Sequence, residues 1–491
     1  MERRSREQSS QNFQLISEQK IRRALDSATE EFRWGWNVVA ALVSPDPGGK
    51  IGQSVVDFQL RLFDAIANLE NSYREIIREE QRLIGRKPRL NTQWFAKRMA
   101  KLAGYRRAVK DGLAVGRAVG DGFAWVFYER DRNLITEHLK LQRQPLLPPF
   151  IGRLGERSSL SAMRYIDGKF LIYHGTTTFL RMGDVSFIDM KTMRVASIGE
   201  LKTQQIGENK LSVTAVFLAD KDQNLPKFNV KPRSNENRPE LPVLMKQRLN
   251  RQIREFLASM EVARSNSAEP IHAGQIPFHY DVLQKLVERS HTKKFEYAVT
   301  DDGLLIGAVR FRNSNSLGEV LLKKKTPNVD RLLAEVRPRA EKIIRKDSNK
   351  NSLIIGTIGV ESGNLISSSD ILPLSMWPLS AEVLHDILFA KVMVITIYNP
   401  AYFSESLKAR GYEVTTDERG RPKTAIRNDG KKCQKLENLH YFTELLQRTL
   451  LTQEGILGMI DQVSDRVLEK AEGKSFGAQI IPRIHRFRPV S

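Results

Sequence analysis

The chain has 491 residues, which is too long for a single ordinary domain and indicates two or three. Hydrophobic residues make up 41% and charged residues 27%, so the chain can form packed cores and is not disordered throughout. Lysine and arginine outnumber aspartate and glutamate by 78 to 57, and this net charge of +21 favours a polyanionic partner, nucleic acid before membrane. The single cysteine, Cys433, excludes a disulfide framework and a cysteine-rich zinc site.

Neither a secretory leader nor a membrane span is predicted. Residues 1–11 are polar and charged, with no apolar segment behind them. The most apolar stretch, 371–403, contains the ionisable residues Glu382, His385, Asp386 and Lys391, whereas a spanning helix needs roughly 18 or more apolar residues with few charges. We therefore expect a cytoplasmic protein that makes no membrane contact.

The first third of the chain has the periodicity of helices. Over 54–83, apolar residues recur every three or four positions, which predicts a long amphipathic helix. A second, basic helical block follows Thr92, and a third covers 121–141, where aromatic side chains are expected in the core. The basic block is either a solvated face or a contact for nucleic acid or a partner subunit. Residues 1–145 are predicted to form this helical region.

After Pro148 the period changes to that of strands, and the class predicted for the whole chain is α/β, specifically α+β. A central domain is expected over 146–315, with a mixed sheet flanked by helices and a polar insertion near 205–243. A C-terminal α/β accessory region is expected over 316–491. The predicted strands are 169–174, 184–189, 195–201, 295–300, 304–311, 353–360 and 392–397, and the predicted helices of these two parts are 244–262, 436–448 and 453–472.

Two common kinds of catalytic motif are absent from the sequence. There is no HExxH, and the eight histidines do not pair at metal-ligand spacing. Gly473-Lys474-Ser475 resembles the end of a phosphate-binding loop, but Leu468 stands where the leading glycine belongs. Zinc chemistry and ATP hydrolysis are therefore disfavoured.

The segment 183–203 carries the residues best suited to chemistry. Asp184 opens one predicted strand, a short turn follows, and the next strand contains Glu200 and Lys202. Residues two apart on a strand point to the same face, so Glu200 and Lys202 project side by side, and pairing across the turn brings Asp184 to Glu200. Two carboxylates and an ammonium group are thus expected in one small volume.

Phosphodiester hydrolysis uses such a set of groups. Oxygen ligands from Asp184 and Glu200 suit Mg²⁺ or Mn²⁺ bound together with a phosphate and waters, and Lys202 is placed to orient or deprotonate a water. An acid two positions before a lysine recurs elsewhere in the chain, but only this copy lies in an apolar strand preceded by a strand that begins with an acid. The alternative is a charged strand end on a solvated face.

This hairpin resembles the core of the PD-(D/E)XK nuclease superfamily, the restriction-endonuclease-like proteins. Asp184 matches the first acid of the motif, Glu200 the second and Lys202 the lysine, while Gly183 stands in place of the proline. The resemblance extends over 155–311 and implies a helix, a three-stranded meander, a second helix and a fourth strand. It also implies a glutamate on the first helix near the metal, for which Glu156 is the candidate.

Further polar residues are secondary candidates. Gln204 follows the lysine strand, and Arg248 and Gln252 lie four apart on a predicted helix that would line the phosphate side of a cleft. His174 ends the first strand, although a histidine satisfied by local hydrogen bonds is the commoner case. The expected phosphate-binding cations are Lys323, Lys324, Lys325, Arg337, Arg339, Lys342, Arg345, Lys346, Arg483, Arg486 and Arg488.

The sequence as a whole favours a metal-dependent nuclease that acts on nucleic acid, DNA rather than RNA. The resemblance implies a bacterial restriction or anti-phage defence setting. Two alternatives stay open, namely a non-catalytic nucleic-acid-binding or scaffold protein and a subunit of a larger complex or homo-oligomer.

Overall fold

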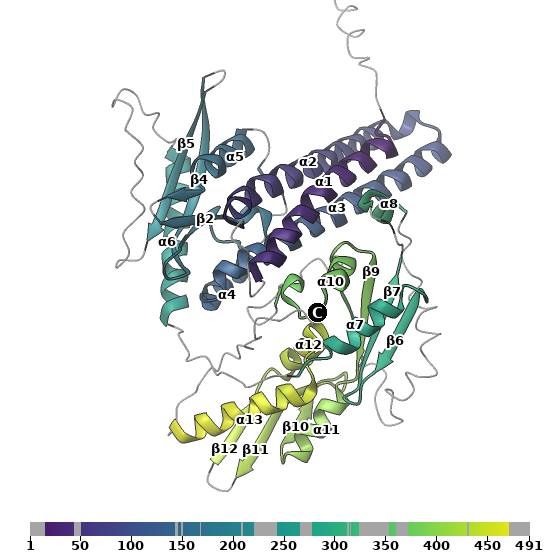
Figure 1. Cartoon of the computed structure of the whole chain (residues 1–491), viewed down its shortest axis with the longest axis vertical. Coiled ribbons are helices and arrows are strands. Elements are labelled where there is room, and N and C mark those ends of the chain that lie inside the picture. The colour runs from purple at the N-terminus through teal and green to yellow at the C-terminus, as the bar shows by residue number, and fades with distance from the viewer. Residues whose placement is uncertain are drawn as a thin grey trace, which may run out of the picture.

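The computed structural model describes the greater part of the chain. The described ranges are 15–43, 51–142, 146–148, 151–166, 168–207, 210–219, 243–265, 277–311, 314, 316–323, 353–359, 372–429 and 432–470. Within them the protein combines a helical N-terminal region with three sheets, and every strand pairing is antiparallel (Figure 1). The predicted α+β class is confirmed.

Three long helices lie side by side in the N-terminal region: α1 (Glu18–Val43), α2 (Ile51–Arg86) and α3 (Thr92–Tyr128) (Figure 1). The 3₁₀ turn η1 (Lys87–Arg89) joins α2 to α3, and α4 (Arg132–Lys140) follows. The apolar stripe predicted for α2 is buried against the other two helices, with Phe58 stacked on Phe123 of α3. α3 continues through Asp121, where the sequence had suggested a new helix.

The second unit is a five-stranded meander preceded by α5 (Ile151–Ala162) and followed by α6 (Val243–Ser265). Its strands pair in chain order: β1 (Tyr165–Ile166), β2 (Lys169–Tyr173), β3 (Val185–Asp189), β4 (Arg194–Gly207) and β5 (Lys210–Ala219). The prediction of a mixed sheet is wrong, because all the strand pairs of this sheet are antiparallel. Only two residues separate β4 from β5, and so short a connection joins antiparallel strands, because a parallel neighbour needs a crossover of a dozen residues or more. β5 itself occupies part of the predicted insertion.

The predicted fourth strand of the central sheet belongs elsewhere. β6 (Phe295–Val299) and β7 (Leu304–Arg310) form a hairpin that joins β9 (Val392–Tyr398) and β8 (Ile354–Ile358), in the order β6-β7-β9-β8. All seven residues of β7 and of β9 are buried, as is typical of apolar strands at the centre of a covered sheet. This pairing crosses the boundary expected near residue 315, and the domain limits stay a prediction.

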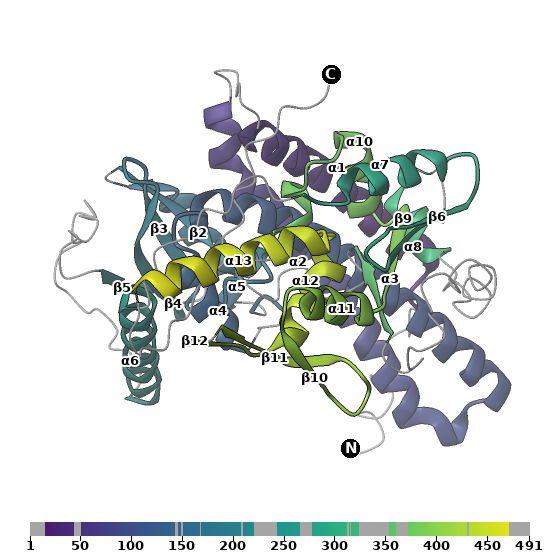
Figure 2. The same cartoon turned by 90° about the horizontal axis from the view of Figure 1, so that it is seen from below.

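Helices and a small third sheet complete the C-terminal part. The sheet has the order β10 (Glu413–Thr416), β11 (Pro422–Asp429), β12 (Lys432–Leu436). The remaining elements are η2 (His174–Thr176), α7 (Tyr280–Arg289), α8 (Leu317–Leu322), η5 (Leu374–Met376), α10 (Ala381–Leu388), α11 (Ala401–Ala409), α12 (Leu439–Thr449) and α13 (Gln453–Lys470). α8 packs against α1 and α3, away from the five-stranded sheet (Figures 1 and 2). No helix within the described ranges is both long and apolar enough to cross a bilayer.

Candidate active site

The hairpin of β3 and β4 brings Asp184, Glu200 and Lys202 to one face of the sheet. Val185 pairs with Gly199, so Asp184 lies beside Glu200 at the start of β3. The backbone N–H of Asp184 donates to the carbonyl oxygen of Gly199 (2.8 Å). The backbone N–H of Leu201 donates to Asp184 Oδ2 (2.7 Å) and fixes the carboxylate against β4. The local geometry expected for these three residues is present, and their role stays a prediction.

Gly183 explains the departure from the proline of the PD-(D/E)XK pattern. Its φ is +72°, and a Cβ at this position would lie 2.6 Å from the carbonyl oxygen of Gly199. Proline fixes φ near −65° and other residues with a Cβ rarely adopt positive φ, so glycine is the residue that fits here. The tight turn that results delivers Asp184 to the end of β3.

Glu200 is buried and accepts two hydrogen bonds at one oxygen. Lys202 Nζ donates to Glu200 Oε1, and Gln252 Nε2 from α6 donates to the same atom (3.1 Å). The Glu200 residue is 6% exposed, while the Lys202 side chain keeps 22% of its surface accessible. Lys202 is therefore the member of this pair that solvent or a ligand reaches more readily. Gln252, predicted to face a phosphate, contacts Glu200 instead.

Glu156 lies behind this face of the sheet. It sits on α5, where Gly155 allows close packing on β4, because a Cβ there would lie 1.8 Å from the side-chain oxygen of Thr203. The Tyr173 hydroxyl donates to Glu156 Oε2. Tyr173 and Gly199 are both paired with Val185, so Tyr173 points to the face opposite Glu200. Glu156 is thus held by Tyr173 on the α5 side and is not among the groups that contact Glu200.

Acidic groups are concentrated at the site, and two of them have a raised pKa. Burial, followed by the neighbouring Glu200 charge, raises the pKa of Asp184 to about 7, although the Leu201 N–H and Lys202 act in the opposite direction. Burial and then the charge of Asp184 raise the pKa of Glu156 to about 8. Near neutral pH, Glu156 is therefore largely protonated and Asp184 about half ionised, and Glu156 also interacts with the charge of Arg153. A bound cation would lower the pKa of both carboxyl groups, because it favours their ionised forms.

The donor set fits a hard divalent ion only in part. Asp184 and Glu200 offer the carboxylate oxygens that Mg²⁺ and Mn²⁺ prefer. Within the described ranges, no three His, Cys, Asp or Glu side chains form a group able to hold a metal ion. Mg²⁺ commonly binds through one or two carboxylates, with waters and substrate phosphates as its other ligands. The two carboxylates here match that mode and would require a substrate or waters to complete it.

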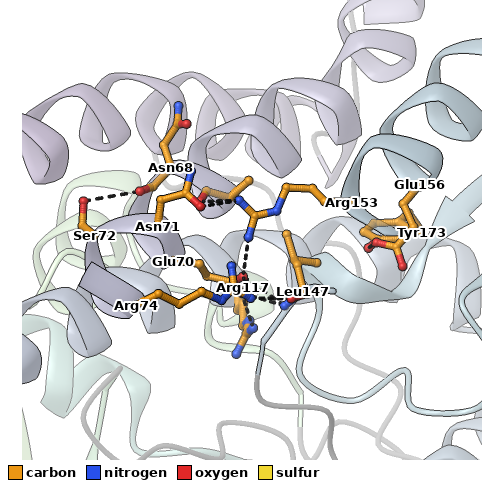
Figure 3. Close-up of polar contacts among 11 residues, drawn as sticks. Asn68, Glu70, Asn71, Ser72, Arg74, Arg117, Leu147, Arg153, Glu156 and Tyr173 are labelled. Carbon is orange, nitrogen blue, oxygen red and sulfur yellow. Dashed lines mark hydrogen bonds and ion pairs between the residues drawn. The ribbon is translucent and has the colours of Figure 1, made fainter. Parts of the chain in front are cut away.

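A buried network that the sequence did not predict ties α5 to α2 (Figure 3). Arg153 of α5 donates to Asn71 Oδ1 (2.6 Å) and to the carbonyl oxygen of Ala67 (3.2 Å), and it lies 3.6 Å from the Glu70 carboxylate. Glu70 is fully buried and also contacts Arg74 (3.3 Å), Arg117 (3.2 Å) and the backbone N–H of Leu147 (3.0 Å). The network fixes the helix that carries Glu156.

A second buried contact from α2 holds β2. Gln59 Nε2 donates to the carbonyl oxygen of Leu171 (2.5 Å), and Gln59 Oε1 accepts from the N–H of Tyr173 (2.6 Å). The amide of Gln59 thus substitutes for a neighbouring strand along this part of β2. Sequence reasoning missed both Gln59 and Tyr173, and the only signal was a glutamine beside the apolar stripe of α2.

His174 has a structural role. Its Nδ1–H donates to the Gly183 carbonyl oxygen (3.0 Å), so Nε2 is the acceptor for the Ser186 hydroxyl (2.7 Å). Burial lowers the pKa of His174 to about 4, which keeps the ring neutral at physiological pH. Local hydrogen bonding, the commoner case for a histidine, therefore accounts for this residue.

The other predicted residues are distributed widely. Gln204 is half-buried on β4, on the same face as Glu200 and Lys202. Arg248 lies in α6, and its side chain falls outside what the structure describes. Lys323 follows α8 and contacts Glu319 (3.4 Å), so the structure does not bring it to the site. The predicted cations that lie outside the described residues are Lys324, Lys325, Arg337, Arg339, Lys342, Arg345, Lys346, Arg483, Arg486 and Arg488.

Comparisons with known proteins do not identify a family for this chain. No family model matches it, and no curated protein or solved structure is significantly similar.

Proposed function

We propose that the protein is a metal-dependent nuclease that hydrolyses phosphodiester bonds, with DNA as the favoured substrate. One observation carries the proposal: Asp184, Glu200 and Lys202 share one face of the β3–β4 hairpin. The pKa of Asp184, raised by burial and by the neighbouring Glu200 charge, supports a cation there, and the net charge of +21 supports a polyanionic substrate. The resemblance to PD-(D/E)XK nucleases extends the proposal to cytoplasmic restriction or anti-phage defence.

Each residue has a distinct part in this proposal. Asp184 and Glu200 would hold Mg²⁺ or Mn²⁺, and a bound ion of this kind lowers the pKa of water and offsets charge on phosphate. Lys202 is the accessible cation beside them, placed to orient a water or to stabilise the developing phosphate charge. Gln252 orients Glu200 through its hydrogen bond, and Gln204 is a further polar contact on the same face.

The test compares metal-dependent cleavage by the wild type with that by near-isosteric variants, Asp184→Asn, Glu200→Gln and Lys202→Met. Linear and supercoiled DNA and RNA are offered with Mg²⁺ or Mn²⁺. Each variant should lose about a hundredfold or more in rate, the usual contribution of a group that transfers a proton or stabilises charge. The matched control is Glu18→Gln with Lys20→Met, an acid and lysine at the same spacing on α1, which should cleave normally.

The outcomes separate the proposal from its failures. Activity that survives all three substitutions would mean that the site lies elsewhere. Binding of nucleic acid with no cleavage by the wild type, with either metal and any substrate, would reject the nuclease.

A second function is favoured by one specific contact. Lys202 lies directly on Glu200, an arrangement that also suits a structural ion pair in a non-catalytic nucleic-acid-binding or scaffold subunit. A structural pair predicts that Glu200→Gln alone destabilises the fold, since it leaves the lysine without its partner, and that Mg²⁺ does not raise the melting temperature. A metal site predicts that Mg²⁺ stabilises the wild type but not Asp184→Asn.

A further inference from the structure

A concentrated positive surface lies at the connected ends of α2 and α3. We define the hairpin end as residues 81–110, which comprise the end of α2, η1 and the first half of α3. It contains ten lysines and arginines and no aspartate or glutamate, so it supplies nearly half of the chain's net charge of +21. In both views it projects from the edge of the molecule (Figures 1 and 2).

Most of these cations face solvent. Arg98 and Arg106 are half-buried and pair with the buried residues Glu79 (2.6 Å) and Glu80 (2.7 Å), so they hold the hairpin together. The others are exposed: Arg82, Arg86, Lys87, Arg89, Lys97, Lys101, Arg107 and Lys110. Mutual repulsion among so many exposed like charges disfavours the free state and favours a polyanion that neutralises them.

An aromatic side chain lies within this surface. Trp94, in the first turn of α3, is 40% exposed, whereas Trp36, Trp125 and Trp377 are all buried. Its backbone N–H is held by the Asn91 side chain (3.0 Å), which fixes the start of the helix. Exposed tryptophan is enriched at surfaces that contact a partner, because its ring is apolar and its N–H can donate a hydrogen bond. A lipid bilayer would instead require a larger apolar patch, and Ile84 is the only other large exposed apolar residue of the hairpin end.

We infer that the hairpin end binds the backbone of duplex DNA at a distance from the site of cleavage. The inference rests on the proposed nuclease only in taking that enzyme's substrate as the ligand. α2 contacts β2 through Gln59, and Arg86 ends the helix 27 residues later, which is roughly 40 Å at 1.5 Å per residue. That length corresponds to about 12 base pairs of duplex at 3.4 Å each. The hairpin end therefore contacts only DNA that extends well beyond the scissile bond.

The test measures duplex binding in the inactive Asp184→Asn background. The triple variant Lys87→Glu, Lys97→Glu, Lys110→Glu changes three exposed lysines of the hairpin end. The matched control, Lys285→Glu, Lys408→Glu, Lys423→Glu, makes the same change of charge at exposed lysines of the C-terminal part. Circular dichroism and melting temperature establish that both variants are folded.

The expected results depend on the length of the duplex. For a 40-base-pair duplex, the hairpin-end variant should bind about tenfold or more weakly than the control, and the slope of log affinity against log salt should fall by about three, near 0.9 per lost phosphate contact. For an 8-base-pair duplex, which is too short to contact both surfaces at once, the difference between the two variants should be smaller. DNA should also quench tryptophan fluorescence in the wild type, and Trp94→Phe should remove that quenching.

Each contrary result overturns a defined part of the inference. Equal binding of the long duplex by the two triple variants would reject the hairpin end as a DNA contact, while leaving the nuclease proposal intact. Tighter binding of an RNA duplex, of polyglutamate or of phosphatidylserine vesicles than of DNA would reject the assigned partner. Loss of long-duplex binding in the hairpin-end variant, together with a wild type that never cleaves, would support this inference and reject the nuclease.

Discussion

The buried carboxyl group of Glu156 provides a quantitative test of the site's electrostatics. The residue is 6% exposed, and its pKa is raised to about 8 from an ordinary value of 4.5, first by burial and then by the Asp184 charge. At about 1.4 kcal/mol per pKa unit, ionisation of this carboxyl group at high pH lowers the free energy of unfolding by roughly 5 kcal/mol. Glu156→Gln should remove this loss of stability at high pH, because the amide stays neutral and its oxygen still accepts a hydrogen bond from Tyr173.

The direction of the effect follows from proton binding. Below pH 4.5 the carboxyl group is protonated in both the folded and the unfolded chain. Between pH 4.5 and 8 only the folded chain keeps the proton, so stability falls as the pH rises. Above pH 8 the folded protein carries a buried negative charge. Wild type should therefore lose more stability between pH 5 and pH 9 than Glu156→Gln, by about 4 kcal/mol.

Urea denaturation at pH 5, 7 and 9 measures this difference, with the melting temperature as a second probe. Glu382→Gln, which changes an exposed glutamate on α10, is the matched control and should follow the wild type at each pH. Parallel pH profiles for wild type and Glu156→Gln would refute the reasoning, because they would mean that Glu156 titrates as an ordinary surface carboxyl.

Three further predictions concern α2, α3 and the metal. Gln59→Ala leaves the buried carbonyl of Leu171 and N–H of Tyr173 without their partner, so it should cost about 2 to 5 kcal/mol; an unchanged melting temperature would contradict this. Gly104 lies within α3, where a Cβ would meet nothing within 4 Å, so Gly104→Ala should stabilise the protein by about 0.5 to 1 kcal/mol. A lower melting temperature would show that the position has an unseen contact. The pKa of Asp184 is about 7, and a carboxyl group binds metal only when it is ionised. Mg²⁺ affinity, measured by calorimetry, should therefore fall about tenfold for each pH unit below pH 7. An affinity that does not change with pH would exclude this carboxylate as a ligand.

The hairpin could be predicted from the sequence because its signal is local. Alternation fixes which side chains of one strand share a face, so Glu200 and Lys202 follow from pattern alone. The register that the turn sets, with Asp189 opposite Arg194, shifts by one residue between Phe187 and Ile188. This irregularity brings Asp184 opposite Glu200, and the sequence pattern does not show it. Gly183 was noted as a departure from a family pattern, and the structure gives its cause in a positive φ that proline cannot adopt.

The remaining features depend on contacts between distant segments. The residue pattern of the strands at 295–311 does not specify the sheet to which they belong. Their partner, β9, is more than 80 residues farther along the chain, so the pattern cannot identify it. Glu156 was correctly placed on the helix before the meander, but only the packing of α5 through Gly155 shows that Tyr173 holds it. For the basic block after Thr92, both a solvated face and a binding face stayed open, because the sequence does not show that Arg98 and Arg106 turn inward.

The helix α2 connects the candidate active site to the hairpin end. Near one end it binds β2 through Gln59 and α5 through the paired contacts of Asp64 with Arg157 (2.7 and 2.9 Å), and farther along it binds Arg153 through Asn71. Its other end carries the cations of the hairpin end. A continuous α-helix resists bending over this length, so the separation between the two surfaces is set by the number of residues in α2. Under the two proposals, the length of DNA that the enzyme requires beyond the scissile bond is therefore a property of this helix, and inserting or deleting whole turns within its exposed end should change that length in proportion.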